Sequence, residues 1–130
     1  MALTVSRAPS YPPAVDMHSL KGKRALVCWS TQGIGKAAAL ELAARGAAVT
    51  LFARDPIAGE RVRAELPGTG HTVRAADFGD NEAVRQAAAA EVRDGGAIHI
   101  LVNNTGGPPA GPIVDASPDA FLTAFLAHLI

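Results

Sequence analysis

The sequence of 130 residues has one cysteine, one tyrosine and one tryptophan. The single cysteine, Cys28, excludes an internal disulfide. The four histidines have neither HExxH spacing nor cysteine partners, which excludes the usual zinc sites, and we expect no metal. The one tyrosine, Tyr11, has Val15 four residues later, and neither lysine nor arginine follows Arg93. A mechanism that needs a tyrosine and a lysine late in the chain therefore cannot be performed by these residues alone.

A net charge is also lacking, since 12 Lys and Arg balance 12 Asp and Glu. Without a basic block the chain lacks the electrostatic footprint of a nucleic-acid or anionic-membrane binder, and neither partner is expected. The balance conceals an asymmetry. Residues 1–65 hold nine basic and five acidic side chains (+4), and residues 66–130 hold three and seven (−4). If the chain binds an anion, we expect the site in the first half.

Long apolar runs are missing, both for a bilayer span and for a signal peptide, so we expect a soluble, cytoplasmic protein. Residues 1–20 combine Pro9, Pro12 and Pro13 with no hydrophobic periodicity, which is typical of a flexible tail. We therefore expect residues 21–130 to form the folded part.

Short apolar runs alternate with helical patterns along that part. We expect strands at 24–29, 48–53, 71–75 and 98–103, and helices at 33–45, 56–66, 81–94 and 118–130. Asp55 and Asp80 occupy helix N-cap positions. This order predicts an α/β fold, a three-layer αβα Rossmann-type parallel sheet with helices on both faces.

A glycine-rich turn, residues 30–35 (STQGIG), joins the first strand to the first helix. Such a turn presents backbone N–H groups and the positive end of a helix dipole to a phosphate. Gly33 allows backbone to approach the phosphate and Gly35 allows close helix–strand packing. The alternative is a tight turn without a ligand. A Walker-type loop is excluded because Ala37, rather than Ser or Thr, follows Lys36.

Residues 25–35 (ALVCWSTQGIG) resemble the ALVTGxxxGIG segment of the short-chain dehydrogenase/reductase family. Matches follow at residues 53–55 (ARD), 76–78 (ADF) and 101–106 (LVNNTG), the last similar to the family's NNAG motif. The glycine- and proline-rich run 106–112 resembles the 3-oxoacyl-carrier-protein reductase-like branch. The likeness extends over residues 21–130 and implies a partial NAD(P)-binding Rossmann domain.

The resemblance also implies roles for individual residues. The pyrophosphate and its ribose would be wrapped by the turn, at Ser30, Gln32, Gly33, Ile34 and Gly35. Asp77 would bind the adenine amino group with Phe78 beside the ring, and Asn104 and Gly106 would line the cofactor. The alternative for Asp77 is that it is a solvated acid in a loop and binds no adenine. For Asn103 and Asn104 the alternative role is turn formation. Asn103-Asn104-Thr105 also matches a glycosylation sequon, but a buried strand in a cytoplasmic chain disfavours glycosylation.

The charge after the second strand bears on nucleotide choice. NAD-preferring members place a carboxylate there to bind the ribose 2′-hydroxyl. Here Ala53 takes that position and Arg54 follows, which favours NADP(H) over NAD(H) because a guanidinium pairs with a 2′-phosphate. The alternative is a surface Arg54 that pairs with Asp55 or Glu60.

The sequence departs from the family at several points. Trp29 replaces the early glycine and Cys28 the preceding threonine; the indole would block the site, displace the loop, or turn away and pack on the sheet. His128 stands where the family has a proton-relay asparagine, and is either a relay or an ordinary helix residue. The last helix has no C-terminal cap, so we expect a chain truncated after the fourth strand and part of the following helix.

These observations predict the cofactor-binding half of an NADP(H)-dependent oxidoreductase that transfers hydride between carbonyl and alcohol. Without the family's catalytic Tyr and Lys the chain would be inactive alone, so no catalytic residue is assigned. The alternatives are a non-catalytic nucleotide-binding or regulatory module, or an inactive fragment. The apolar last helix predicts marginal stability or association, as a homo- or hetero-oligomer.

Overall fold

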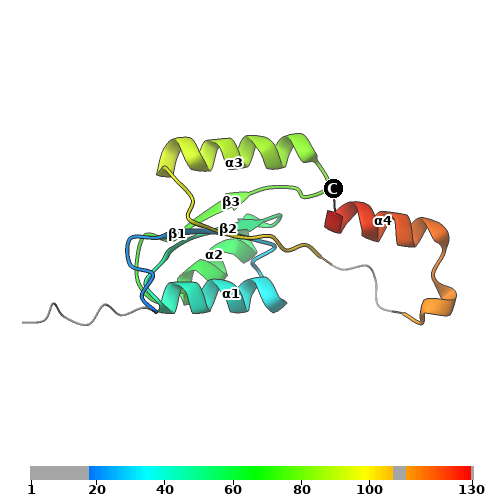
Figure 1. Cartoon of the computed structure of the whole chain (residues 1–130), viewed down its shortest axis with the longest axis horizontal. Coiled ribbons are helices and arrows are strands. Elements are labelled where there is room, and N and C mark those ends of the chain that lie inside the picture. Colours follow the sequence, from blue (N-terminus) through cyan, green and yellow to red (C-terminus); the bar gives the residue numbers. More distant parts are fainter. Residues whose placement is uncertain (1–17, 107–110, 130) are drawn as a thin grey trace, which may run out of the picture.

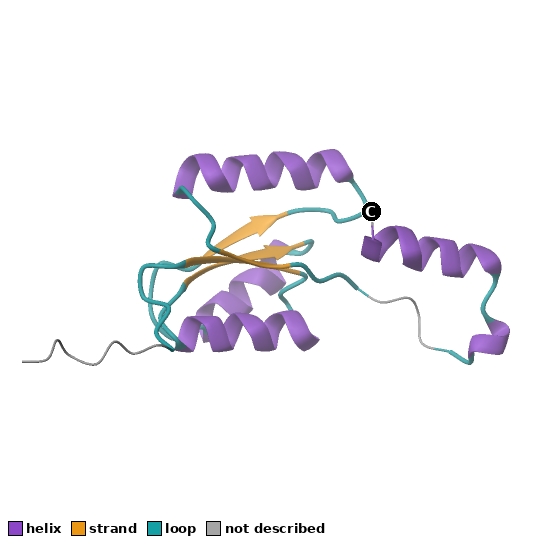
Figure 2. Ribbon diagram, viewed as in Figure 1, coloured by secondary structure: helices purple, strands orange, loops and turns teal. Residues whose placement is uncertain are grey.

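The computed structural model describes residues 18–106 and 111–129. Its strands are β1 (Arg24–Cys28), β2 (Ala48–Ala53), β3 (Thr72–Ala75) and β4 (Ile100–Val102). Its helices are α1 (Gly33–Ala44), α2 (Pro56–Glu65), α3 (Asn81–Gly95), α4 (Pro118–Leu129) and the 3₁₀ helix η1 (Ile113–Asp115). Figures 1 and 2 show α1 and α2 on one face of the sheet and α3 on the other. The predicted three-layer, Rossmann-type α/β fold is confirmed.

The strands are parallel and lie in the order β3-β2-β1-β4. The chain therefore adds strands to one side of β1 and then crosses over to its other side. Ligands of such sheets bind beyond the carboxyl ends of the strands where the order reverses. Here that point lies between β1 and β4, so the turn after β1 faces the segment after β4.

One face of the sheet packs against α1 and α2. Val27 and Leu51, which are register partners, are fully buried there. The helices contribute small side chains such as Ala39 and Ala43, together with Val62. Alanines let α1 lie close to β1, which brings the first turn of α1 to the end of that strand.

The opposite face, under α3, buries a carboxylate. Glu91 is 2% exposed although α3 lies on the surface of the molecule. Its Oε1 accepts hydrogen bonds from Thr50 Oγ1 (2.7 Å) and from Arg24 Nη2, and its Oε2 accepts one from Arg74 Nε (2.9 Å). A buried charge is tolerated only when it is paired and hydrogen-bonded, and Glu91 meets both conditions.

The two guanidiniums extend this network to the end of α3. Arg24 Nη1 donates to the carbonyl oxygen of Gly96 (2.8 Å), and Arg74 Nη2 donates to Asp94 Oδ2 (2.6 Å). The hydrogen bond from Arg74 holds the pKa of the Asp94 carboxyl below its ordinary value. The last turn of α3 is thus attached to β1, β2 and β3 by polar contacts.

The helix starts were predicted well because their caps are local. Asp55 Oδ1 accepts from the N–H of Ile57 (2.8 Å), and Asp80 Oδ1 from those of Glu82 (2.9 Å) and Ala83 (3.1 Å). The 3₁₀ helix η1, in contrast, was not predicted from the sequence.

Four boundaries, in three of the strands, were wrong. The strand predicted at 24–29 ends at Cys28 because Trp29 adopts a left-handed backbone, with φ of 49°. The strands predicted at 71–75 and 98–103 begin later, at Thr72 and Ile100, where an imidazole accepts a backbone N–H of the neighbouring strand, and the second of them ends at Val102. The N–H of Val49 donates to His71 Nδ1 (3.1 Å) and that of Arg24 to His99 Nδ1 (3.1 Å).

Several predictions fall outside the described residues. They include the tail up to residue 17, the part of the loop at residues 107–110, and the side chain of His128. Within the described part, Leu20 packs against the core, and its N–H donates to the carbonyl oxygen of Arg45 (2.8 Å).

Replacing Glu91 with alanine should destabilise the fold strongly, since it leaves two guanidiniums facing each other without their carboxylate. We expect Glu91→Ala to lower the free energy of unfolding in urea by about 3 kcal/mol. The control is Glu60→Ala, which removes an exposed ion pair with Arg63 and should cost less than about 1 kcal/mol. Equal losses for the two variants would contradict a structural role for the buried carboxylate.

Candidate functional site

The turn between β1 and α1 depends on an unusually close backbone contact. A Cβ atom at Gly35 would lie 2.2 Å from the carbonyl oxygen of Trp29, a distance that no side chain tolerates. Gly33, the first residue of α1, has φ of 54°, which also favours glycine. The two glycines therefore let the chain turn sharply and bring the start of α1 against the end of β1.

The N-terminus of α1 differs from those of α2 and α3. Its N-cap residue, Gln32, makes no side-chain cap hydrogen bond, whereas Asp55 and Asp80 cap the other two helices. Uncapped N–H groups at a helix start, together with the helix dipole, attract an anion. Lys36 in the first turn does not fold back over this end, because its Nζ pairs with Glu65 of α2 (2.8 Å).

A cavity of 540 Å³ lies in front of this helix start. It brings together residues from the turn after β1 and from the segment after β4, as the strand order requires. Its lining residues are Trp29, Gln32, Gly33, Ile34, Asn104, Thr105 and Gly106. Five of the ten predicted site residues thus line one cavity. Thr105 was not singled out, although it belongs to the LVNNTG segment.

A second cavity of 220 Å³ lies beside the end of β2. Its lining residues are Trp29, Thr31, Gln32, Ala53, Arg54, Asp55 and Ala58. Arg54 is the predicted site residue that it adds. Asp55 was predicted as a helix cap and as an alternative partner of Arg54, not as a lining residue, and no sequence signal marked Ala58.

Arg54 is exposed and makes no ion pair with any residue that the structure describes. Both acids considered as partners are engaged elsewhere, since Asp55 caps α2 and Glu60 pairs with Arg63 (2.6 Å). The guanidinium carbon instead lies 5.5 Å from the centroid of the Trp29 ring, a cation–π arrangement. The donor groups of Arg54 are therefore available to an anion in the smaller cavity.

Four predicted residues line neither cavity, and one of them, Gly35, lies against the backbone of Trp29. Ser30 is fully buried, and its hydroxyl donates to the carbonyl oxygen of Phe52 (3.2 Å). Asp77 is exposed, and its Oδ1 accepts from the N–H of Gly79 (3.0 Å), which makes it a turn-forming acid. Phe78 is half-buried against the Trp29 ring. The contacts of Ser30, Gly35, Asp77 and Phe78 with a cofactor stay predictions.

Through its ring, Trp29 contacts residues that follow the strand ends. Its ring lies 5.9 Å from that of Phe78, at an interplanar angle of 65°, and beneath the Arg54 guanidinium. On another side it contacts Gly106, where a Cβ atom would lie 2.5 Å from Cζ2 of the indole. The indole therefore lies at the mouth of the site, between the segments that follow β2, β3 and β4.

Cys28, directly before Trp29, is buried at the end of β1. Burial raises the pKa of the Cys28 thiol above its ordinary value, and a hydrogen bond to the backbone of Asn104 opposes this rise only in part. A thiol with a raised pKa is mostly protonated at neutral pH and is a poor nucleophile. Cys28 is thus a buried structural residue at the end of β1.

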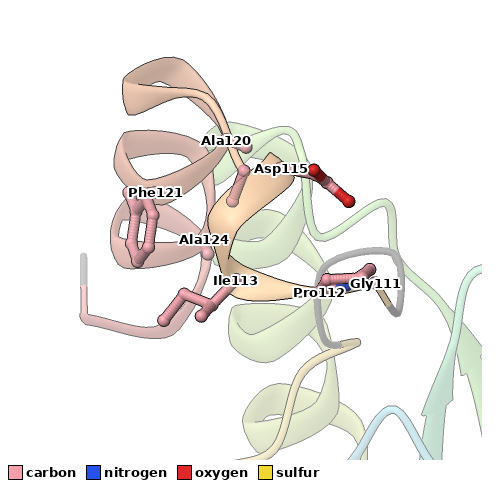
Figure 3. Close-up of a pocket in the computed structure, with 8 residues that line it drawn as sticks. Gly111, Pro112, Ile113, Asp115, Ala120, Phe121 and Ala124 are labelled. Carbon is pink, nitrogen blue, oxygen red and sulfur yellow. The ribbon is translucent and has the colours of Figure 1, made fainter.

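A third cavity, of 470 Å³, lies between η1 and α4 (Figure 3). Its lining is mostly apolar and includes Ile113, Ala120, Phe121 and Ala124. No predicted site residue contributes to it. Among the described residues no helix is long and apolar enough to cross a bilayer. The same part of the chain brings together no group of three His, Cys, Asp or Glu side chains that could hold a metal.

The sequence is similar to known proteins over nearly the whole described fold. A family profile described as short chain dehydrogenase matches residues 23–127. The chain belongs to the short-chain dehydrogenase family. The match contains the lining residues of all three cavities and the turn between β1 and α1.

Curated relatives of this short-chain dehydrogenase chain are longer than it is. Versicolorin reductase 1 of Aspergillus parasiticus is 37% identical over 113 residues, which are 85% of this chain and 43% of the relative. Gluconate 5-dehydrogenase of Gluconobacter oxydans is 36% identical over 104 residues, 78% of this chain and 41% of the relative. The chain thus spans less than half the length of these relatives.

The chain also resembles solved structures that are longer than it is. A gluconate 5-dehydrogenase from Burkholderia cenocepacia, in complex with NADP and tartrate, superposes with a TM-score of 0.74 at 32% identity. The superposition covers 88% of this chain and 46% of that one. A 3-ketoacyl-(acyl-carrier-protein) reductase from Brucella melitensis, complexed with NADH, superposes with a TM-score of 0.70 at 33% identity over 82% of this chain and 44% of that one.

The close contact at Gly35 predicts a steep penalty for a single added methyl group. We expect Gly35→Ala to lower the free energy of unfolding by about 2 kcal/mol, because backbone has to move to relieve the clash. Gly111→Ala is the control, since a Cβ there meets nothing within 4 Å, and should change stability by less than about 0.5 kcal/mol. Thermal unfolding followed by circular dichroism checks both variants. An unchanged Tm for Gly35→Ala would contradict the proposed contact.

The buried Cys28 predicts slow thiol chemistry. At pH 8 a disulfide reagent should modify the folded chain at least about tenfold more slowly than the chain unfolded in urea, because both the raised pKa and burial reduce the accessible thiolate. The absorbance of the released thiol measures both rates. Equal rates in the two conditions would show that Cys28 is accessible and ionised.

Proposed function

We propose that this chain binds NADP(H), in preference to NAD(H), as the cofactor-binding part of an oxidoreductase that interconverts carbonyl and alcohol groups. The observation that carries the proposal is the uncapped start of α1, which opens into a cavity at the point where the strand order reverses. Membership of the short-chain dehydrogenase family and structural neighbours that hold NADP and NADH support it.

The residues of the larger cavity suit a pyrophosphate and the nicotinamide half of a dinucleotide. A Cβ atom at Gly33 would meet nothing within 4 Å, so the backbone is open to a ligand there. The first-turn N–H groups then bind phosphate oxygens without any lysine. Asn104 and Thr105 add amide and hydroxyl groups on the opposite wall of the same cavity.

The preference for NADP(H) rests on Arg54. The position that ends β2 holds Ala53, which has no carboxylate to bind a ribose 2′-hydroxyl or to repel a 2′-phosphate. Asp55 also lines the smaller cavity, but its carboxylate accepts the N–H of Ile57 at the start of α2. The Arg54 guanidinium, which is exposed and makes no ion pair with any described residue, then provides paired N–H donors to a 2′-phosphate.

The bound dinucleotide would supply or accept a hydride at its nicotinamide ring. This chain's part is to bind and orient it, through the start of α1, Arg54 and the segment after β4. The family's proton-transferring Tyr and its Lys have no counterpart in these 130 residues, where Tyr11 is the one tyrosine. We therefore propose that the 130-residue chain binds cofactor without itself reducing a carbonyl.

The surface of α4 supports the expected association with a second subunit. Phe121, Leu122, Phe125 and Leu126 are all exposed on this helix. Apolar groups gathered on one helix favour burial against another protein surface. We include association through α4 in the proposal.

Removing the charge of Arg54 tests the nucleotide preference. We expect Arg54→Gln to weaken NADP⁺ binding about tenfold and NAD⁺ binding less than about threefold, because only NADP⁺ carries the 2′-phosphate. Isothermal titration calorimetry measures both affinities. Arg61→Gln is the matched control, because Arg61 is exposed on α2 and lines neither cavity. Equal weakening for both nucleotides would disprove the role of Arg54.

A further inference from the structure

Trp29 occupies a backbone position that favours glycine. Its φ of 49° makes it the one non-glycine residue with a positive φ among the described residues. A bulky side chain in this conformation is rare and costs backbone strain, which persists only where surrounding contacts hold it. The contacts made by the indole are therefore strong enough to keep the turn in this form.

Those contacts lie on three sides of the ring. The Arg54 guanidinium carbon is 5.5 Å from the ring centroid, and the Phe78 ring meets it edge-on at 5.9 Å. The benzo part of the indole reaches Gly106, where a Cβ would lie 2.5 Å from Cζ2 and 2.9 Å from Cη2. Only a glycine at position 106 leaves room for the ring. The indole thus bridges from the segment after β2 to the segment after β4.

This bridge lies between the two cavities of the site. Both are lined by Trp29 and Gln32, and they have no other lining residue in common. The smaller cavity contains Arg54, and the larger one contains the uncapped helix start with Asn104 and Gly106. A dinucleotide that binds Arg54 with its 2′-phosphate and the segment after β4 with its other half has to extend through the position of the ring.

We propose that the Trp29 indole is a gate that divides the cofactor groove into two compartments, and that a dinucleotide binds only when the indole swings out. The inference rests on the proposed function. A ligand confined to the Arg54 compartment does not require this movement. When the indole swings out, its contacts with Arg54, Phe78 and Gly106 are broken. The free energy of these contacts therefore opposes binding of the dinucleotide, but not binding of the shorter ligand.

The test compares NADP⁺ with adenosine 2′-monophosphate, which carries the 2′-phosphate but lacks the pyrophosphate and the nicotinamide half. Calorimetry on the full 130-residue chain gives both affinities. We expect Trp29→Gly to tighten NADP⁺ binding at least about tenfold, and to change binding of the monophosphate less than about threefold. Glycine suits the φ of 49°, so this variant should keep the fold, which circular dichroism checks.

Two further variants grade the effect. Trp29→Phe keeps a ring beside Arg54 but lacks the benzo group that reaches Gly106, and should tighten NADP⁺ binding by an intermediate factor. Ile34→Ala is the matched control, because Ile34 is a large side chain, 78% exposed, that lines the larger cavity without lying between the two. It should produce no gain in NADP⁺ affinity. A gain for Ile34→Ala as large as that for Trp29→Gly would overturn the gate.

The fluorescence of Trp29, the one tryptophan of the chain, gives a second readout in the unmodified protein. We expect NADP⁺ to increase quenching of this fluorescence by acrylamide, as the indole leaves its contacts, and adenosine 2′-monophosphate to leave quenching unchanged. Quenching that stays constant or falls with NADP⁺ would overturn the gate.

The outcomes separate the gate from the proposed function. NADP⁺ binding of equal strength to the unmodified chain and to Trp29→Gly would overturn the gate and leave the proposed function standing. Absence of nucleotide binding to both proteins would overturn the proposed function and the gate with it.

Discussion

The approach of Gly35 to the carbonyl oxygen of Trp29 is the constraint on which the geometry of the site depends. With a Cβ excluded by backbone at 2.2 Å, α1 starts immediately beside the end of β1. The uncapped N–H groups of that helix then lie where the strand order reverses, between the segments that follow β2 and β4. Any side chain at position 35 would move α1 outward and separate the anion-attracting end from the cavity walls.

The two faces of the sheet are held by different kinds of interaction. Under α1 and α2 the contacts are apolar and the helices contribute small side chains. On the α3 face, Leu26, Phe52 and Ala76 form a small buried cluster, and Glu91 adds hydrogen bonds to Arg24, Arg74 and Thr50. Because the carboxylate joins three neighbouring strands, the polar network holds α3 in one place where apolar packing alone is sparse.

Much of the fold was predictable because its signals are local. Asp55 and Asp80 indicate helix starts, and apolar runs indicate buried strands. The order of the elements and the parallel sheet could therefore be predicted from the sequence. Two of the missed boundaries lie beside partners distant in sequence, as when His99 accepts the N–H of Arg24, 75 residues away. Glu91 shows the same limit: nothing in the pattern of α3 distinguishes a buried carboxylate from a solvated one.

In the site, too, residues marked by local motifs were predictable, and those whose placement depends on distant segments were not. The cavity lining at Gly33, Asn104 and Gly106 was predictable because a turn and a family motif mark these residues, whereas the placement of Trp29 depends on three segments that meet only in the folded chain. The ring that lies between the two cavities is also the ring over which Arg54 is held. Because this ring contacts Arg54 and lies between the cavities, any movement of the indole out of the groove also breaks its contact with the guanidinium.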